Sequence, residues 1–197
     1  MKFCYALLLA TAIGLPVSAQ QRYPVQFNFS TEFFPENYPD ARQSFTLAAG
    51  EVVNGYVVRY LQCYQIPSSE NRNRLEQEGL HFLSYVSFGT YLVAIPENFD
   101  IENLAILNPR SIVEVEPAWK LANSLRQQPP GEWAVHGDLI DVNIQVYSHV
   151  TISQGAEWCR QNGLTVLTEG NQNGFLQLRL PKENLDALAA FGASQDT

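Results

Sequence analysis

The chain of 197 residues has few charged residues, few cysteines and few histidines. Charged residues make up 16% of the sequence, below the roughly 25% of an average globular protein. The 12 basic and 20 acidic residues give a net charge of −8, which excludes a nucleic-acid binder that relies on a basic surface. Three cysteines exclude a disulfide-dense miniprotein, and three scattered histidines argue against a zinc enzyme. An apolar share of 46% excludes intrinsic disorder, and the length suits one large or two small domains.

Residues 1–19 are typical of a secretory signal peptide. Lys2 precedes an apolar run from Phe3 to Leu15, and the small residues Val17 and Ala19 stand at the −3 and −1 positions of a cleavage site. The run is shorter than the roughly 20 apolar residues that cross a bilayer. We therefore expect a mature chain that is secreted, periplasmic or at the cell surface, with no membrane contact after signal removal.

Residues 20–51 form an irregular leader rich in Pro, Tyr and Phe, which we expect to lie over the next domain. Residues 52–123 then follow the order strand, helix, strand, strand, helix, strand, which is that of the ferredoxin-like motif. We expect a polar helix to open at Ser68, a turn at 87–90 to join the two middle strands, and a short second helix at 101–107. After a linker at 124–137, the same order begins again in 138–197. Gly79 aligns with Gly163 at a spacing of 84, and Pro96 aligns with Pro181 at a spacing of 85, which indicates an internal duplication. The sequence therefore predicts an α+β fold of two tandem ferredoxin-like modules.

The second module is incomplete at its end. After Phe191 only six residues remain, where the first module continues into its fourth strand. A sheet without that strand leaves unpaired backbone groups on its neighbour. We therefore expect the chain to be a fragment, or the front part of a longer product.

The two sheets are expected to differ on the face that the helices leave open. In the second module, apolar residues such as Ile140 and Val142 alternate with polar ones such as Asp141 and Asn143, which predicts a polar open face. An offset of 84 transfers this alternation to the first module. Its open face is then apolar, and such a face normally covers something. The alternatives are a partner domain, or the leader or second module of the same chain. The predicted contact residues are Val57, Arg59, Leu61, Leu83, Tyr85 and Leu92.

The same alignment bears on the two cysteines of the mature chain. Cys63 and Cys159 could form one disulfide in an oxidising compartment, or remain as buried thiols. The offset of 84 places Cys159 at the core-facing helix position of Leu75 and Cys63 on the open side of the sheet. This separation favours two thiols.

The sequence offers no catalytic, metal or cofactor site. His136 and Asp138 are close in sequence, but no nucleophile accompanies them, and the members of a catalytic triad usually come from distant segments. The remaining histidines and cysteines lack metal-ligand spacing. A Gly-rich phosphate loop is also absent from the sequence. We therefore predict a chain that is not itself an enzyme and needs no cofactor.

The first module resembles the N-terminal prodomain-like region of secreted subtilisin-like serine proteases, especially the large ones of Bacteroidetes-type bacteria. The resemblance rests on Leu75-Glu76-x-x-Gly79 after an opening strand, on Tyr91-Leu92-Val93 before Pro96, and on an Ile112-Val113 strand followed by Pro117 and Lys120-Leu121. The second module is similar to the second module that such proteins often carry. The catalytic Asp-[Ser/Thr]-Gly, His-Gly-Thr and Gly-Thr-Ser motifs of the family do not occur in this chain.

This resemblance implies a non-catalytic prosegment. Such a segment assists the folding of the protease or inhibits it by laying its open sheet on the catalytic domain, which would follow in the same chain. The alternative is a free-standing secreted module that binds a peptide or a glycan.

Overall fold

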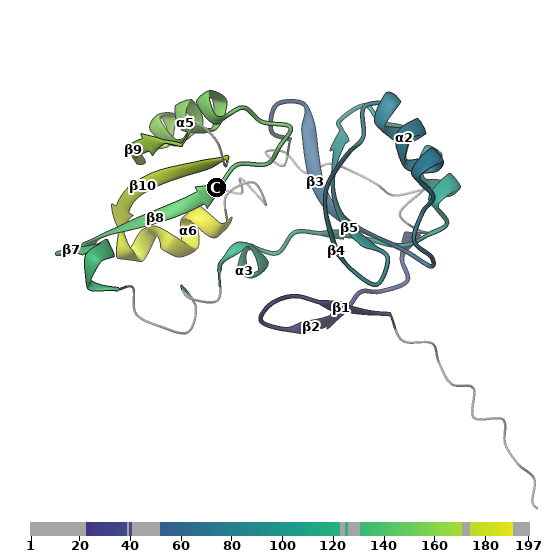
Figure 1. The fold of residues 1–197 in the computed structure, drawn as a ribbon, viewed down its shortest axis with the longest axis horizontal. Helices are drawn as coiled ribbons and strands as arrows, with labels where there is room; N and C mark the ends of the chain where they lie inside the picture. Colours follow the sequence, from purple (N-terminus) through teal and green to yellow (C-terminus); the bar gives the residue numbers. More distant parts are fainter. Residues whose placement is uncertain are drawn as a thin grey trace, which may run out of the picture.

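The computed structural model describes residues 23–38, 40, 52–122, 125, 131–170 and 174–190. Antiparallel sheets and short helices make up this part of the chain, so the predicted α+β class is confirmed. Two four-stranded sheets each have their own hydrophobic core, and a small two-stranded hairpin lies beside the first (Figure 1). The predicted signal peptide and the chain after residue 190 lie outside the described residues, as do parts of the leader and linker.

The first module contains β3 (Tyr56–Cys63), α2 (Ser69–Gln77), β4 (His81–Ser87), β5 (Thr90–Pro96), the 3-10 helix η1 (Ile101–Leu107) and β6 (Pro109–Glu114). Its sheet has the order β4-β5-β3-β6 with antiparallel neighbours, which is the strand order of the ferredoxin-like motif. Ser68 begins α2 by accepting a hydrogen bond from the Asn71 backbone N–H. Asn108 ends η1 in a left-handed conformation.

The core of the first module lies between one face of the sheet and the two helices. Leu75 of α2 and Leu104 of η1 are fully buried there. Val57 and Leu61 of β3 meet them from the sheet, at 1% and 0% exposure. Strand alternation places Arg59, which is also buried, on the same side. The prediction that these three residues line an open face is therefore wrong.

The error arises from the length of one helix. The N-caps of α2 and of α5 (Ile152–Gln161), Ser68 and Thr151, lie 83 residues apart, whereas Gly79 and Gly163 after the helices lie 84 apart. Helix α5 has 10 residues and α2 has nine, so the offset of 84 holds only after the helices. A slip of one residue exchanges the two faces of a strand.

The other three predicted contact residues do not form one surface either. Leu92 of β5 lies on the face opposite the helices, whereas Tyr85 of β4 pairs with Tyr91, which belongs to the core beneath the helices. The pairing of β4 with β5 shifts at two irregularities, which interrupt the alternation of side chains. Leu83 is half-buried beside the first of these irregularities.

The leader covers the sheet face that the helices leave open. It forms a hairpin of β1 (Pro24–Gln26) and β2 (Thr31–Phe33), and Val25 of β1 and Phe34 directly after β2 are buried. These two side chains pack with Tyr60 of β3 and Val115, and with partly buried apolar side chains around them. Of the two alternatives for this face, the structure shows cover from within the chain.

The leader also covers one edge of the first sheet. The Asn37 side chain donates to the Ile112 carbonyl at 2.9 Å and accepts from the Ile112 N–H at 2.9 Å. An amide that bonds both backbone groups of one residue takes the place of a further strand beside β6. Arg110 adds a hydrogen bond to the Phe34 carbonyl at 2.8 Å. The leader is thus an integral part of the first module.

The second module contains β8 (Leu139–Gln145), α5, β9 (Thr165–Glu169), β10 (Phe175–Pro181), the 3-10 helix η3 (Lys182–Asn184) and α6 (Leu185–Ala190). The short η2 (Glu132–Ala134) and β7 (Val135–His136) precede them. The sheet order is β7-β8-β10-β9, so β7 pairs with β8 at the place that β6 takes beside β3. The expected linker thus supplies two residues that pair with β8, along part of the sheet edge where the sequence predicted a missing fourth strand.

A short helix, α3 (Pro117–Lys120), follows the first module and contacts α6 of the second. Its Trp119 stacks on Phe27 of the leader at 5.3 Å between ring centres. Burial lowers the pKa of Lys120 in this helix to about 8. Among the helices of the described ranges, none has the length and apolar character of a membrane span.

Candidate functional site

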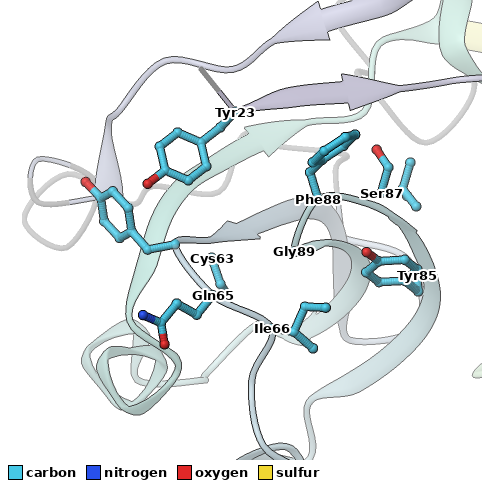
Figure 2. A pocket seen from close by; sticks show the side chains of 10 residues that line it. Tyr23, Cys63, Gln65, Ile66, Tyr85, Ser87, Phe88 and Gly89 are labelled. Atoms are coloured by element: carbon cyan, nitrogen blue, oxygen red, sulfur yellow. The ribbon is translucent and has the colours of Figure 1, made fainter. Parts of the chain in front are cut away.

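A shallow groove of about 650 Å³ lies at one end of the first sheet (Figure 2). The turn between β4 and β5 forms one wall, and the segment that follows β3 and the start of the leader form the others. Among the six predicted contact residues, Tyr85 reaches this groove and is exposed, at 53%. The lining residues carry no formal charge and are Tyr23, Cys63–Ile66 and Tyr85–Gly89.

The rim of the groove carries exposed apolar side chains. Ile66 is 66% exposed and Phe88 is 52% exposed, and both lie within one short stretch of the surface with Tyr85. Large apolar side chains that gather around one concave surface are typical of a binding site rather than of ordinary surface. The groove is therefore the candidate functional site.

The turn that presents Phe88 has an unusual backbone. Phe88 and Gly89 have φ angles of 45° and 71°, and Ser87 pairs with Thr90 on either side of them. This is the geometry of a two-residue type I′ turn, whose first position favours Asn, Asp or Gly. A Cβ atom on Gly89 would come within 2.8 Å of the Cys63 carbonyl oxygen, so glycine is required there. A phenylalanine in the left-handed region costs about 1–3 kcal/mol, and such strain is concentrated at functional positions.

The tyrosine side of the groove is held by contacts to side chains outside it. The rings of Tyr23 and Tyr64 meet edge to face at 5.6 Å, and the Arg110 guanidinium lies 5.0 Å from the centre of the Tyr23 ring. The Tyr64 hydroxyl donates to the Glu36 carboxylate, which raises the pKa of Tyr64. The two tyrosines are thus oriented before any ligand arrives, which reduces the entropy cost of binding.

Cys63 lines the groove, but its thiol is buried. It is 1% exposed, and burial raises its pKa to about 12. Cys159 is buried in the core of the second module, and both cysteines are free. The expectation of two buried thiols is confirmed, although Cys63 faces the helices and not the open side.

A polar cluster lies on the sheet of the second module. Arg179 of β10 binds both carboxylate oxygens of Asp141 of β8, at 2.6 and 2.8 Å. His136 of β7 also contacts this carboxylate, with 3.1 Å between Nε2 and Oδ2. Hydrogen bonding to Arg179 above all holds the pKa of Asp141 below its usual range. The sequence suggested Asp138 as the neighbour of His136, whereas the structure places Asp141 there. The cluster joins three strands, and both of its carboxylate oxygens are already engaged.

Across the described residues, no three side chains of the His, Cys, Asp and Glu types lie close enough together to hold a metal ion.

The comparisons with known proteins identify one family model. Residues 19–116 match a family described as a domain of unknown function, DUF8729. No curated protein and no solved structure matches the chain. The matched range contains the leader and the first module from β3 to β6, and it ends before α3. The matched range thus includes both the leader and the first sheet, which pack against each other.

Sequence reasoning found the turn at 87–90 but missed the groove. The signal that was available is the bulky Phe88 directly before a turn glycine, where a small or polar residue is expected. The contribution of Tyr23 could not be found in this way, because it depends on where the leader folds back onto β3.

Proposed function

We propose that the chain is a non-catalytic binding module that acts as the prosegment of a secreted subtilisin-like serine protease and contacts the catalytic domain through the groove. This differs from the docking mode expected from the sequence, because the leader occupies the sheet face that was to meet the protease. The groove supports the proposal because its rim combines exposure with apolar character.

The conformation of Phe88 is the observation that carries the proposal. A side chain that is 52% exposed contributes little to the core, and the turn would be more stable with Asn in its place. A binding role accounts for retaining a phenylalanine there, since aromatic side chains supply much of the energy in protein interfaces. The uncharged lining favours an apolar segment of a protein partner.

The test is a titration of the mature chain against a subtilisin-like catalytic domain whose nucleophilic serine has been replaced. We expect saturable binding in isothermal titration calorimetry. Phe88→Asn should weaken the affinity about 30-fold, the effect of losing about 2 kcal/mol at an interface hot spot. The same substitution should leave the urea midpoint unchanged or higher, because it removes the strain of the turn.

Phe175→Asn is the matched control, since Phe175 is an aromatic residue of the second module with 41% exposure. It should leave the affinity unchanged. If the wild-type chain fails to bind the catalytic domain, the prosegment role is refuted. If it binds and Phe88→Asn has no effect, the role stands and the groove is not its contact surface. Binding of short apolar peptides without binding of the domain would favour the free-standing module.

A further inference from the structure

The two modules meet at a cluster of four aromatic side chains, which we name the junction cluster: Tyr56, His81, Tyr147 and His149. Tyr56 begins β3 and His81 begins β4 in the first module. Tyr147 and His149 lie in the segment between β8 and α5 of the second. The ring of His149 lies 5.1 Å from that of Tyr56 and 6.2 Å from that of His81, with the two imidazoles nearly parallel at 14°.

The surroundings of His149 stabilise a positive charge on its imidazole only weakly. Its Nδ1 atom is buried and has no hydrogen-bond partner. The titratable side chains that face it are Tyr56 from β3, His81 from β4 and Tyr147 of its own segment. Within the described ranges, no carboxylate forms an ion pair with His149. The neutral imidazole therefore suits the junction better than the imidazolium.

The surrounding groups act in the same direction. Burial, and after it the charge of His81, lower the pKa of His149. His81 places its Nε2 3.3 Å from the Tyr56 hydroxyl, so its ring brings a second imidazole, and no carboxylate, next to His149. Tyr60 lies near Tyr147, and burial above all raises the pKa of both side chains. Both hydroxyls therefore stay neutral at acidic pH. The tyrosine faces attract a cation, but they cannot accept the proton of Nδ1 as a hydrogen bond.

We propose that His149, stacked on His81, is an acid-sensitive latch that holds the two modules together at neutral pH and releases them when His149 is protonated. The covalent connection through α3 persists, so release changes the angle and distance between modules whose separate cores stay folded. The structure supports this separation of effects, because the two hydrophobic cores share no residue. The proposal is independent of the groove and of its partner.

The direction of the pH effect follows from linkage. Separated modules leave His149 in water, where a histidine has a pKa of about 6.5. Joined modules bind its proton more weakly, so the joined arrangement is favoured above that value and loses its advantage as the pH falls below it. At a pH below both pKa values, the equilibrium moves toward separated modules by a factor that the difference between the two pKa values sets.

The experiment follows the mature chain by small-angle X-ray scattering between pH 8 and pH 5. We expect the radius of gyration to increase below about pH 6.5, while far-UV circular dichroism stays constant. His149→Phe keeps a ring in the stack and removes its titration, so its radius should not respond to pH. His136→Phe is the control, since His136 lies at the Asp141 pair, and it should behave like the wild type.

A titration of His149 by NMR on the wild-type chain keeps the result decisive if a variant folds poorly. Protonation of His149 without any change in the radius would overturn the proposal. An equal increase in the wild type and in His149→Phe would overturn it as well, because the increase would then come from another group.

Discussion

The leader can be tested as a structural part of the first module with two adjacent phenylalanines. Phe33 and Phe34 are neighbours at the end of β2, yet Phe33 is 59% exposed and Phe34 is 4% exposed. Phe34 packs on Tyr60 and Trp119, with ring centres 5.8 and 5.7 Å apart. Truncation of each to alanine therefore removes the same atoms from opposite environments.

Burial sets the size of the two effects. Truncation of a buried phenylalanine costs about 3–5 kcal/mol, because transfer energy is lost and a cavity remains. Truncation of an exposed one usually changes stability by less than about 0.5 kcal/mol. With a urea dependence of about 1–3 kcal/mol per molar, Phe34→Ala should lower the midpoint of the first module by at least about 1 M.

Urea unfolding followed by circular dichroism and tryptophan fluorescence measures both variants. The first module must be followed by its own transition, since two domains need not unfold together. Equal midpoints for Phe33→Ala and Phe34→Ala would refute the packing of the leader on the sheet. The first sheet would then have the open face that the sequence predicted.

Two further predictions concern side-chain chemistry. Cys63 and Cys159 should remain unmodified by iodoacetamide at pH 8 in the folded chain and both react in urea, since burial raises the pKa of each; alkylation of Cys63 in the folded state, read by mass spectrometry, would contradict its place in the core. Lys120 should acylate faster at pH 8 in the folded chain than in urea, because a pKa of about 8 leaves about half of its amine neutral, against well under about 1% for an ordinary lysine. Slower reaction in the folded chain than in urea would show that the amine is shielded or charged.

Local signals located the elements well. The predicted short helix at 101–107 is η1 with the same bounds, and the polar helix after Ser68 is α2. Gly79 and Gly163 both adopt positive φ angles after their helices, as expected of helix-ending glycines. These features depend on residues within one turn of each other, so the sequence alone suffices to find them.

The assignment of faces failed because it depends on register over a longer distance. The extra residue in α5 falls between the strand and the glycine that anchored the alignment, and a strand side chain changes face with every residue. The same limit applies to the groove, where Phe88 is visible in the sequence but Tyr23 reaches it only through the fold of the leader.

By itself, the sequence determined the α+β class and the repeated order of elements, because hydrophobic period, caps and turn glycines are written in neighbouring residues. The tertiary structure alone decided that the leader covers the first sheet, that β7 pairs with the edge of the second sheet and that His149 meets His81. Each of these contacts joins segments far apart in the chain, and their geometry is set by packing that no local pattern encodes.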